Sequence, residues 1–116
     1  MNSFKRCLEI EYLSVDKTLE IENIVKYKFE RLCNVCNYIL KCKVKVANIA
    51  IQKNVASRFL YMVSISITMP EGFDVYTLRI PQKEHTDSVE QAISDVFATI
   101  YRKLIELKLE SQLQPI

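Results

Sequence analysis

The sequence has little glycine or proline and no long apolar run. Only one glycine and three prolines occur among its 116 residues. The phosphate-binding loops of dinucleotide-binding and P-loop proteins each need several glycines, so both classes of nucleotide site are excluded. No apolar stretch approaches the roughly 18 residues that a membrane-spanning helix requires, and no apolar signal core follows residues 1–6. We therefore expect a protein without membrane association that stays in the cytoplasm.

Residues suited to catalysis are also scarce. The one histidine, His85, falls in a polar stretch before the last predicted helix, and no serine lies in a glycine-flanked nucleophile motif. Cys33 is expected near the C-terminal end of a helix, where the helix dipole disfavours a thiolate. No pair of carboxylates stands out from the solvated acids. We therefore expect no enzymatic activity, no cofactor and no small-molecule substrate.

Four cysteines are present, at positions 7, 33, 36 and 42. Only Cys33 and Cys36 have the two-residue spacing of metal and redox sites. A zinc site would need two more ligands, from Cys42 and either Cys7 or His85. No second pair has this spacing, and a reducing cytosol keeps thiols free. We therefore predict free thiols that pack as small apolar side chains, with no metal and no disulfide.

The chain contains enough apolar material for one folded domain. Hydrophobic residues make up 49% and charged residues 26% of the sequence, which is ordinary for globular proteins. This much apolar surface offsets the conformational entropy that is lost on folding. The length predicts a single domain over residues 1–110, followed by a frayed tail over residues 111–116.

Hydrophobic periodicity predicts four strands and two helices. The strands are expected over residues 7–13, 38–49, 59–69 and 73–80, and the helices over residues 16–34 and 87–109. Thr18 is a candidate N-cap for the first helix, and Asp87 with Glu90 resembles a capping box for the second. The order β-α-β-β-β-α predicts an α+β fold, a two-layer sandwich. Its two helices pack on one face of a four-stranded, mostly antiparallel sheet.

Each predicted helix carries one apolar stripe that should face the sheet. The residues on these stripes that we expect to be buried are Phe29, Leu32, Ile93, Val96, Phe97, Ile100 and Leu104.

The strand over residues 38–49 has the clearest alternation in the chain. Lys41, Lys43 and Lys45 point one way, and the intervening apolar residues point the other. The lysines cannot lie beneath the helices without leaving buried charge unpaired. We therefore expect them on the open face of the sheet, beside the hydroxyl side chains of residues 64–68 if these strands are neighbours.

Basic residues are concentrated in one part of the chain. Residues 23–58 hold eight bases and one acid, whereas the whole chain has a net charge of only +2. Such a local excess is typical of a polyanion-binding surface, although a solvated, lysine-rich sheet face would give the same count. The candidate binding residues are Lys26, Lys28, Arg31, Lys41, Lys43, Lys45, Arg102, Lys103 and Lys108.

Short motifs resemble those of one known family. The first helix opens at Thr18 and carries Lys-Phe-Glu-Arg-Leu over residues 28–32. The last helix has Ala-Ile at 92–93 and Arg-Lys-Leu at 102–104. Together with the element order, over about residues 7–108, these motifs resemble the ribosome hibernation-promoting factor family. Its members are also called ribosome-associated inhibitor A or sigma-54 modulation proteins, and the resemblance is to the short form.

The resemblance implies a non-catalytic stress factor that occupies the mRNA and tRNA channel of the small ribosomal subunit and inhibits translation. Lys28, Arg31, Arg102, Lys103 and Lys108 would then contact rRNA phosphates, with the strand lysines in support. The protein would be monomeric away from the ribosome. Two alternatives stay open. One is a protein-interaction module that kept the fold but lost rRNA binding, and the other is a general double-stranded RNA binder.

Overall fold

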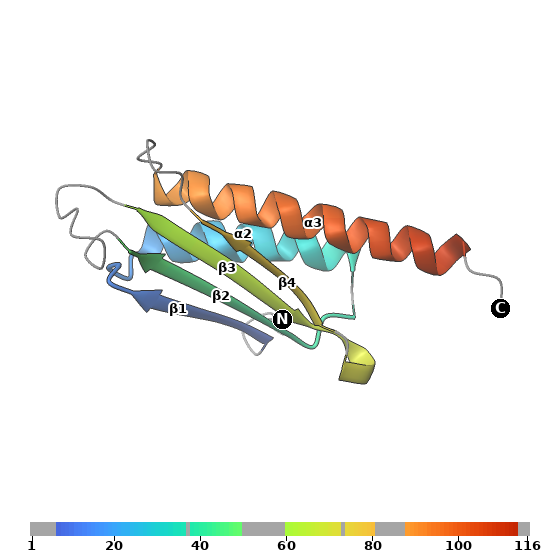
Figure 1. Ribbon diagram of the computed structural model, residues 1–116. Coiled ribbons are helices and arrows are strands. Elements are labelled where there is room, and N and C mark those ends of the chain that lie inside the picture. The colour runs from blue at the N-terminus through green and yellow to red at the C-terminus, as the bar shows by residue number, and fades with distance from the viewer. Residues whose placement is uncertain (1–6, 37, 50–59, 73, 81–87, 114–116) are drawn as a thin grey trace.

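The computed structural model describes residues 7–36, 38–49, 60–72, 74–80 and 88–113 (Figure 1). Its elements follow one another in the order β-α-β-β-β-α, which confirms the predicted order. They are β1 (Leu8–Leu13), α2 (Leu19–Val35), β2 (Lys41–Asn48), β3 (Tyr61–Thr68), a short 3-10 helix (Pro70–Gly72), β4 (Asp74–Arg79) and α3 (Val89–Leu113).

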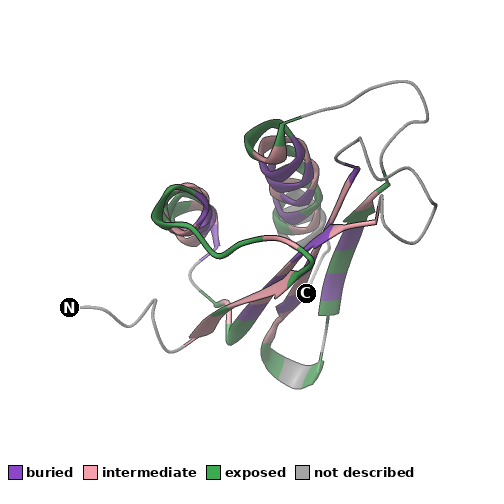
Figure 2. Ribbon diagram, turned by 90° about the vertical axis from the view of Figure 1, so that its left-hand side faces the viewer, coloured by how far each residue is buried: buried purple, intermediate pink, exposed green. Residues whose placement is uncertain are grey.

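The four strands form one sheet in the order β1-β2-β3-β4. The pairs β2–β3 and β3–β4 are antiparallel, whereas β1 and β2 are parallel. A parallel pair needs a crossover connection, and α2 supplies it. Figure 2 shows α2 and α3 on the same face of this sheet, with no described helix on the other face. The predicted two-layer sandwich is therefore confirmed.

The core lies between the helices and the covered face of the sheet. The seven stripe residues predicted to be buried are all buried, so the predicted phases of both helices are confirmed. The alternate residues of β2, namely Cys42, Val44 and Val46, are fully buried beneath them. An ion pair also holds α3 to the edge strand, because Arg79 Nε of β4 donates to Asp95 Oδ2 at 3.1 Å.

Hydroxyl side chains satisfy backbone donors at the start of each helix. Thr18 Oγ1 accepts the Ile21 N–H at 3.2 Å, as predicted. At the start of α3 it is Ser88 Oγ that accepts, from the Gln91 N–H at 3.1 Å. Ser88 lies three residues before Gln91, which is the spacing of an N-cap to the N3 amide. Asp87, the first residue of the predicted capping box, lies outside the described residues, so that box stays a prediction.

The described elements differ from the predicted ranges mainly at their ends. The helix α2 begins at Leu19 rather than at residue 16, because its cap is Thr18. The helix α3 continues to Leu113, past the end expected near Leu109. Asp87, Phe59 and His85 lie outside the described residues. Within the described ranges, no helix has the length and apolar character needed to cross a membrane.

Candidate nucleic-acid interface

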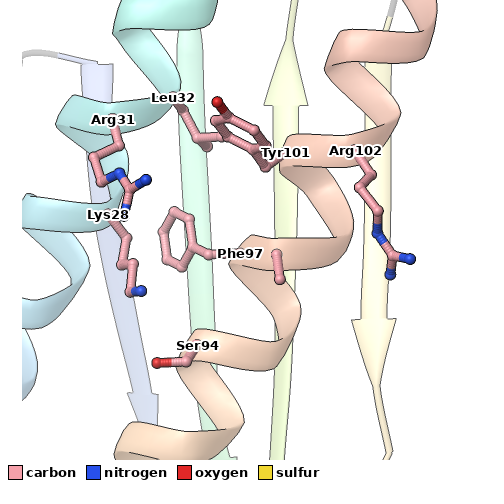
Figure 3. Close-up of a pocket in the computed structure, with 8 residues that line it drawn as sticks. Lys28, Arg31, Leu32, Ser94, Phe97, Tyr101 and Arg102 are labelled. Atoms are coloured by element: carbon pink, nitrogen blue, oxygen red, sulfur yellow. The ribbon is translucent and has the colours of Figure 1, made fainter.

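A groove of about 310 Å³ runs between α2 and α3 on the helical side of the molecule (Figure 3). Residues from both helices line it: Lys28, Arg31, Leu32, Ser94, Phe97, Ala98, Tyr101 and Arg102. Three of these described residues are cations and none is an acid. The groove therefore combines a positive rim with an apolar interior.

The cations on α2 come from one side of that helix. Lys28 and Arg31 are three residues apart, which places them one turn apart on neighbouring positions of the helix surface. Phe29 and Leu32 lie beside them in sequence and are buried against the sheet and α3. The burial of these two residues fixes the rotation of α2, and this rotation leaves Lys28 and Arg31 at the groove.

The floor and far wall of the groove come from α3. Phe97 is only 3% exposed and Leu32 only 1%, so both close the base of the groove with buried apolar side chains. Tyr101 is half-buried, and its ring and that of Phe97 lie between the two helices in Figure 3. Ser94, Phe97 and Tyr101 recur at the three- and four-residue spacing that puts side chains on one helix face. This column of α3 faces Lys28 and Arg31 across the groove.

The remaining cations of α3 are divided between the groove and the sheet edge. Arg102 lines the groove, although its guanidinium points away from α2 in Figure 3. Lys103 lies elsewhere, because its Nζ donates to the Tyr76 carbonyl oxygen of β4 at 2.8 Å. Lys108 is exposed farther along the helix. The structure therefore groups Lys28, Arg31 and Arg102 in one groove and separates Lys103 from them.

Lys26 is on α2 but already has a carboxylate partner. Its Nζ donates to Glu22 Oε1 at 2.7 Å, one turn earlier in the same helix. This pair is partly exposed, so it adds little to stability, but it offsets the charge that Lys26 would offer to a polyanion. Of the three predicted α2 cations, Lys28 and Arg31 therefore remain the stronger candidates.

The lysines of β2 lie on the open face of the sheet, as predicted. Each pairs in register with a hydroxyl residue of β3: Lys41 with Thr68, Lys43 with Ser66 and Lys45 with Ser64. The sequence did not indicate that β1 would lie on their other side. There Lys43 Nζ is 3.2 Å from Glu11 Oε1 and 3.9 Å from Glu9 Oε2. Carboxylates of β1 therefore offset part of the positive charge on this face.

The four cysteines, all of them within the described residues, form no disulfide. Burial, together with a smaller contribution from the nearby Cys7 and Cys33 thiols, raises the pKa of Cys42 to about 12. Burial likewise raises the pKa of Cys33 to about 11, with Cys7, Cys36 and Glu30 adding to the effect. Among the described residues, no three His, Cys, Asp or Glu side chains are placed to hold a metal ion. The Cys33 and Cys42 thiols are therefore poor nucleophiles at neutral pH.

Sequence reasoning found the groove cations but missed its aromatic wall. The apolar stripe correctly predicts that Phe97 is buried, but it gives no binding role to Phe97 or to Tyr101. The available signal was the four-residue spacing of Phe97 and Tyr101 on the flank of the apolar stripe, next to Ile100. Lys53 and Arg58, which belong to the basic segment, lie outside the described residues.

The sequence matches one protein-family model over almost its whole length. Residues 8–112 match the family described as sigma 54 modulation protein / S30EA ribosomal protein. The chain belongs to this family. The match covers every described strand, α2, and α3 except its last residue, so the sigma-54 modulation resemblance seen in the short motifs is confirmed. Among curated proteins, none matches the chain in sequence.

Solved structures share the fold of this S30EA-family chain. A ribosomal subunit interface protein from Coxiella burnetii superposes with a TM-score of 0.69 at 11% identity, covering 88% of this chain and 97% of its own. The N-terminal domain of Protein Y from Thermus thermophilus gives a TM-score of 0.64 at 16% identity, with coverages of 85% and 94%. At identities this low, the similarity to these two structures shows only that the chain shares their fold.

Proposed function

We propose that this protein is a non-catalytic ribosome-binding factor of the cytoplasm that contacts rRNA of the small subunit through the groove between α2 and α3. The observation that carries the proposal is the grouping of Lys28, Arg31 and Arg102 from two helices. Within the described part of the chain, no carboxylate forms an ion pair with any of the three. Cations without protein partners are available to bind phosphates.

Family membership supports the choice of the ribosome as the polyanion. The family description names a ribosomal protein, and the similar Coxiella burnetii structure is that of a ribosomal subunit interface protein. In the proposed mode, the protein occupies the channel that mRNA and tRNA use on the small subunit, and translation is inhibited by occupancy alone. Hibernation under stress is the setting in which such inhibition is useful. The free protein is proposed to be a monomer.

Phosphate contacts of this kind predict how binding behaves. They are independent of base sequence, and they weaken steeply as salt concentration rises because condensed counterions are released on binding. Lysine and arginine side chains on two adjacent helices can span several phosphates of folded RNA. The lysines of β2 would add a weaker contribution, because β1 carboxylates face Lys43.

Sedimentation with ribosomal particles tests the proposal. The purified protein should co-sediment with small subunits in low-salt buffer and leave them in high-salt buffer. It should also lower the yield of a cell-free translation reaction in proportion to its occupancy of the subunits. Absence from ribosomal fractions at low salt would refute the proposal.

One observation favours a second candidate, a protein-interaction module. On the open face of the sheet, Tyr76 and Leu78 of β4 are 54% and 41% exposed. They pair with Ser66 and Ser64 of β3, so their neighbours on that strand are neutral hydroxyl residues. Exposed apolar groups rimmed by polar residues are typical of protein contacts. Capture of a partner protein that is lost on Tyr76→Ser, without ribosome binding, would favour this candidate.

A further inference from the structure

The groove between α2 and α3 contains more than phosphate binding requires. Phosphates need only cations or backbone donors, and these are on the rim. The interior is instead apolar, because the half-buried ring of Tyr101 lies there, above the buried Phe97 and Leu32. A ligand that matches both parts of the groove must carry a negative group and a flat apolar group side by side.

A nucleotide has this combination. We propose that the groove holds one unpaired base of a single RNA strand, stacked on Tyr101, while the flanking phosphates lie on Lys28 and Arg31. The inference rests on the proposed rRNA binding and adds what part of the RNA is recognised. Bases stack on aromatic side chains with little sequence preference, since every base has a π face.

The dimensions and the polar groups of the groove agree with this occupant. Its volume of about 310 Å³ lies at the lower end of the range for small-ligand sites. Ser94 is at the groove, and in Figure 3 its hydroxyl points toward α2, where it can hydrogen-bond a base edge. Ala98 is small and exposed, which leaves the wall of α3 open between Ser94 and Tyr101. A base in a duplex is stacked on its neighbours and cannot enter, so the groove should select single-stranded or bulged RNA.

Charge complementarity decides between RNA and an apolar peptide as the occupant. Lys28, Arg31 and Arg102 line the groove, and none of its described lining residues is an acid. An apolar peptide helix would leave these cations desolvated without partners, which is costly. An RNA strand supplies a phosphate at each nucleotide beside its bases, so a single RNA ligand can contact both the cations and the aromatic wall.

The test compares base-containing RNA with an abasic strand of equal length and charge. Binding of the full chain to a fluorescein-labelled oligoadenylate and to the matching abasic phosphodiester is measured by anisotropy at one salt concentration. We expect the oligoadenylate to bind about tenfold more tightly, as one stacked base contributes. A ratio near one would overturn the inference. If the abasic strand and ribosomal particles still bind, the proposed function survives that result, whereas loss of both would refute the proposed function itself.

Substitutions in the groove locate the effect. Ala98→Leu fills the groove without removing charge, and it should bring the ratio close to one. Tyr101→Ala should do the same. Asn23→Leu adds an identical side chain at an exposed position of α2 outside the groove, so it should keep the wild-type ratio. A tenfold ratio that persists in a folded Ala98→Leu protein would place the base elsewhere and overturn the inference.

A competition arm distinguishes RNA from a free nucleotide. Adenosine monophosphate carries the same base and one phosphate, but it spans fewer cations than a strand does. It should displace the labelled oligoadenylate only at concentrations at least about a hundredfold above that of unlabelled oligoadenylate. Displacement at equal concentrations would overturn the assignment of the groove to an RNA strand.

Discussion

Removing Lys28 and Arg31 together should change how ribosome binding responds to salt. Both side chains lie on the rim of the groove, and neither makes an ion pair with a described carboxylate. The double variant Lys28→Ala with Arg31→Ala therefore removes two phosphate contacts without leaving an unpaired acid behind. The matched control is Lys43→Ala with Lys45→Ala on the open sheet face, where Glu9 and Glu11 already offset part of the charge.

The expected magnitude follows from counterion release. Each lost phosphate contact lowers the slope of log affinity against log salt by about 0.7–0.9. Between about 50 and 200 mM salt, one contact therefore accounts for a change of about threefold in affinity, and two contacts for about tenfold. Over this interval the affinity of the wild type should fall about tenfold more than that of the variant Lys28→Ala with Arg31→Ala. The variant Lys43→Ala with Lys45→Ala should change the slope by less than the amount expected for one lost phosphate contact.

The assay is co-sedimentation of each variant with small subunits at a series of salt concentrations. Thermal unfolding of the free proteins checks that both variants are folded. If the strand pair lowers the slope by two contacts while the helix pair leaves it unchanged, the groove is not the phosphate site. If neither pair changes the slope, the ribosome proposal gives way to the protein-interaction module.

Three further predictions concern stability. Ile93→Ala removes a fully buried side chain of α3 and should lower the free energy of unfolding by about 2–5 kcal/mol in a urea titration; a loss below about 1 kcal/mol would contradict its place in the core. Ser88→Ala should cost about 1 kcal/mol through loss of its bond to the Gln91 amide, whereas Ser88→Asp should retain most of the stability. Burial raises the pKa of Cys33 to about 11 and that of Cys42 to about 12, from an ordinary value of 9.0, so these thiols ionise first in the unfolded chain. The free energy of unfolding should therefore be retained below about pH 9 and should fall as the pH rises toward 12. Cys42→Ala should reduce that fall. An equal dependence of the free energy of unfolding on pH in wild type and variant would argue against burial of this thiol.

Local pattern was sufficient to predict the fold. The alternation of Lys41, Lys43 and Lys45 with apolar residues correctly predicts an open sheet face, because a period of two has one physical interpretation when one set is charged. The apolar stripes correctly predict which helix residues are buried, including Phe29 and Ile93. Each of these patterns lies within a single helix or strand, and hydrophobic periodicity describes single helices and strands.

The site was less predictable, because it depends on how the elements meet. The strand alternation alone could not show that β1 would bring Glu11 to within 3.2 Å of Lys43. Lys103 and Arg102 are adjacent in sequence, yet one bonds a β4 carbonyl while the other lines the groove. The role of Tyr101 depends on the separation of α2 and α3, which the pattern of either helix alone does not determine.

The parallel pairing of β1 with β2 has a consequence for the order in which the molecule folds. The antiparallel pairs join neighbours in sequence, and the Thr68–Asp74 pair closes a short loop. In contrast, Leu8 pairs with Cys42 across the long connection that contains α2. Contacts between distant segments cost more chain entropy and form later. We expect the hairpin of β3 and β4 to form early and β1 to join last, so β1 is the strand whose amides should exchange with solvent most readily.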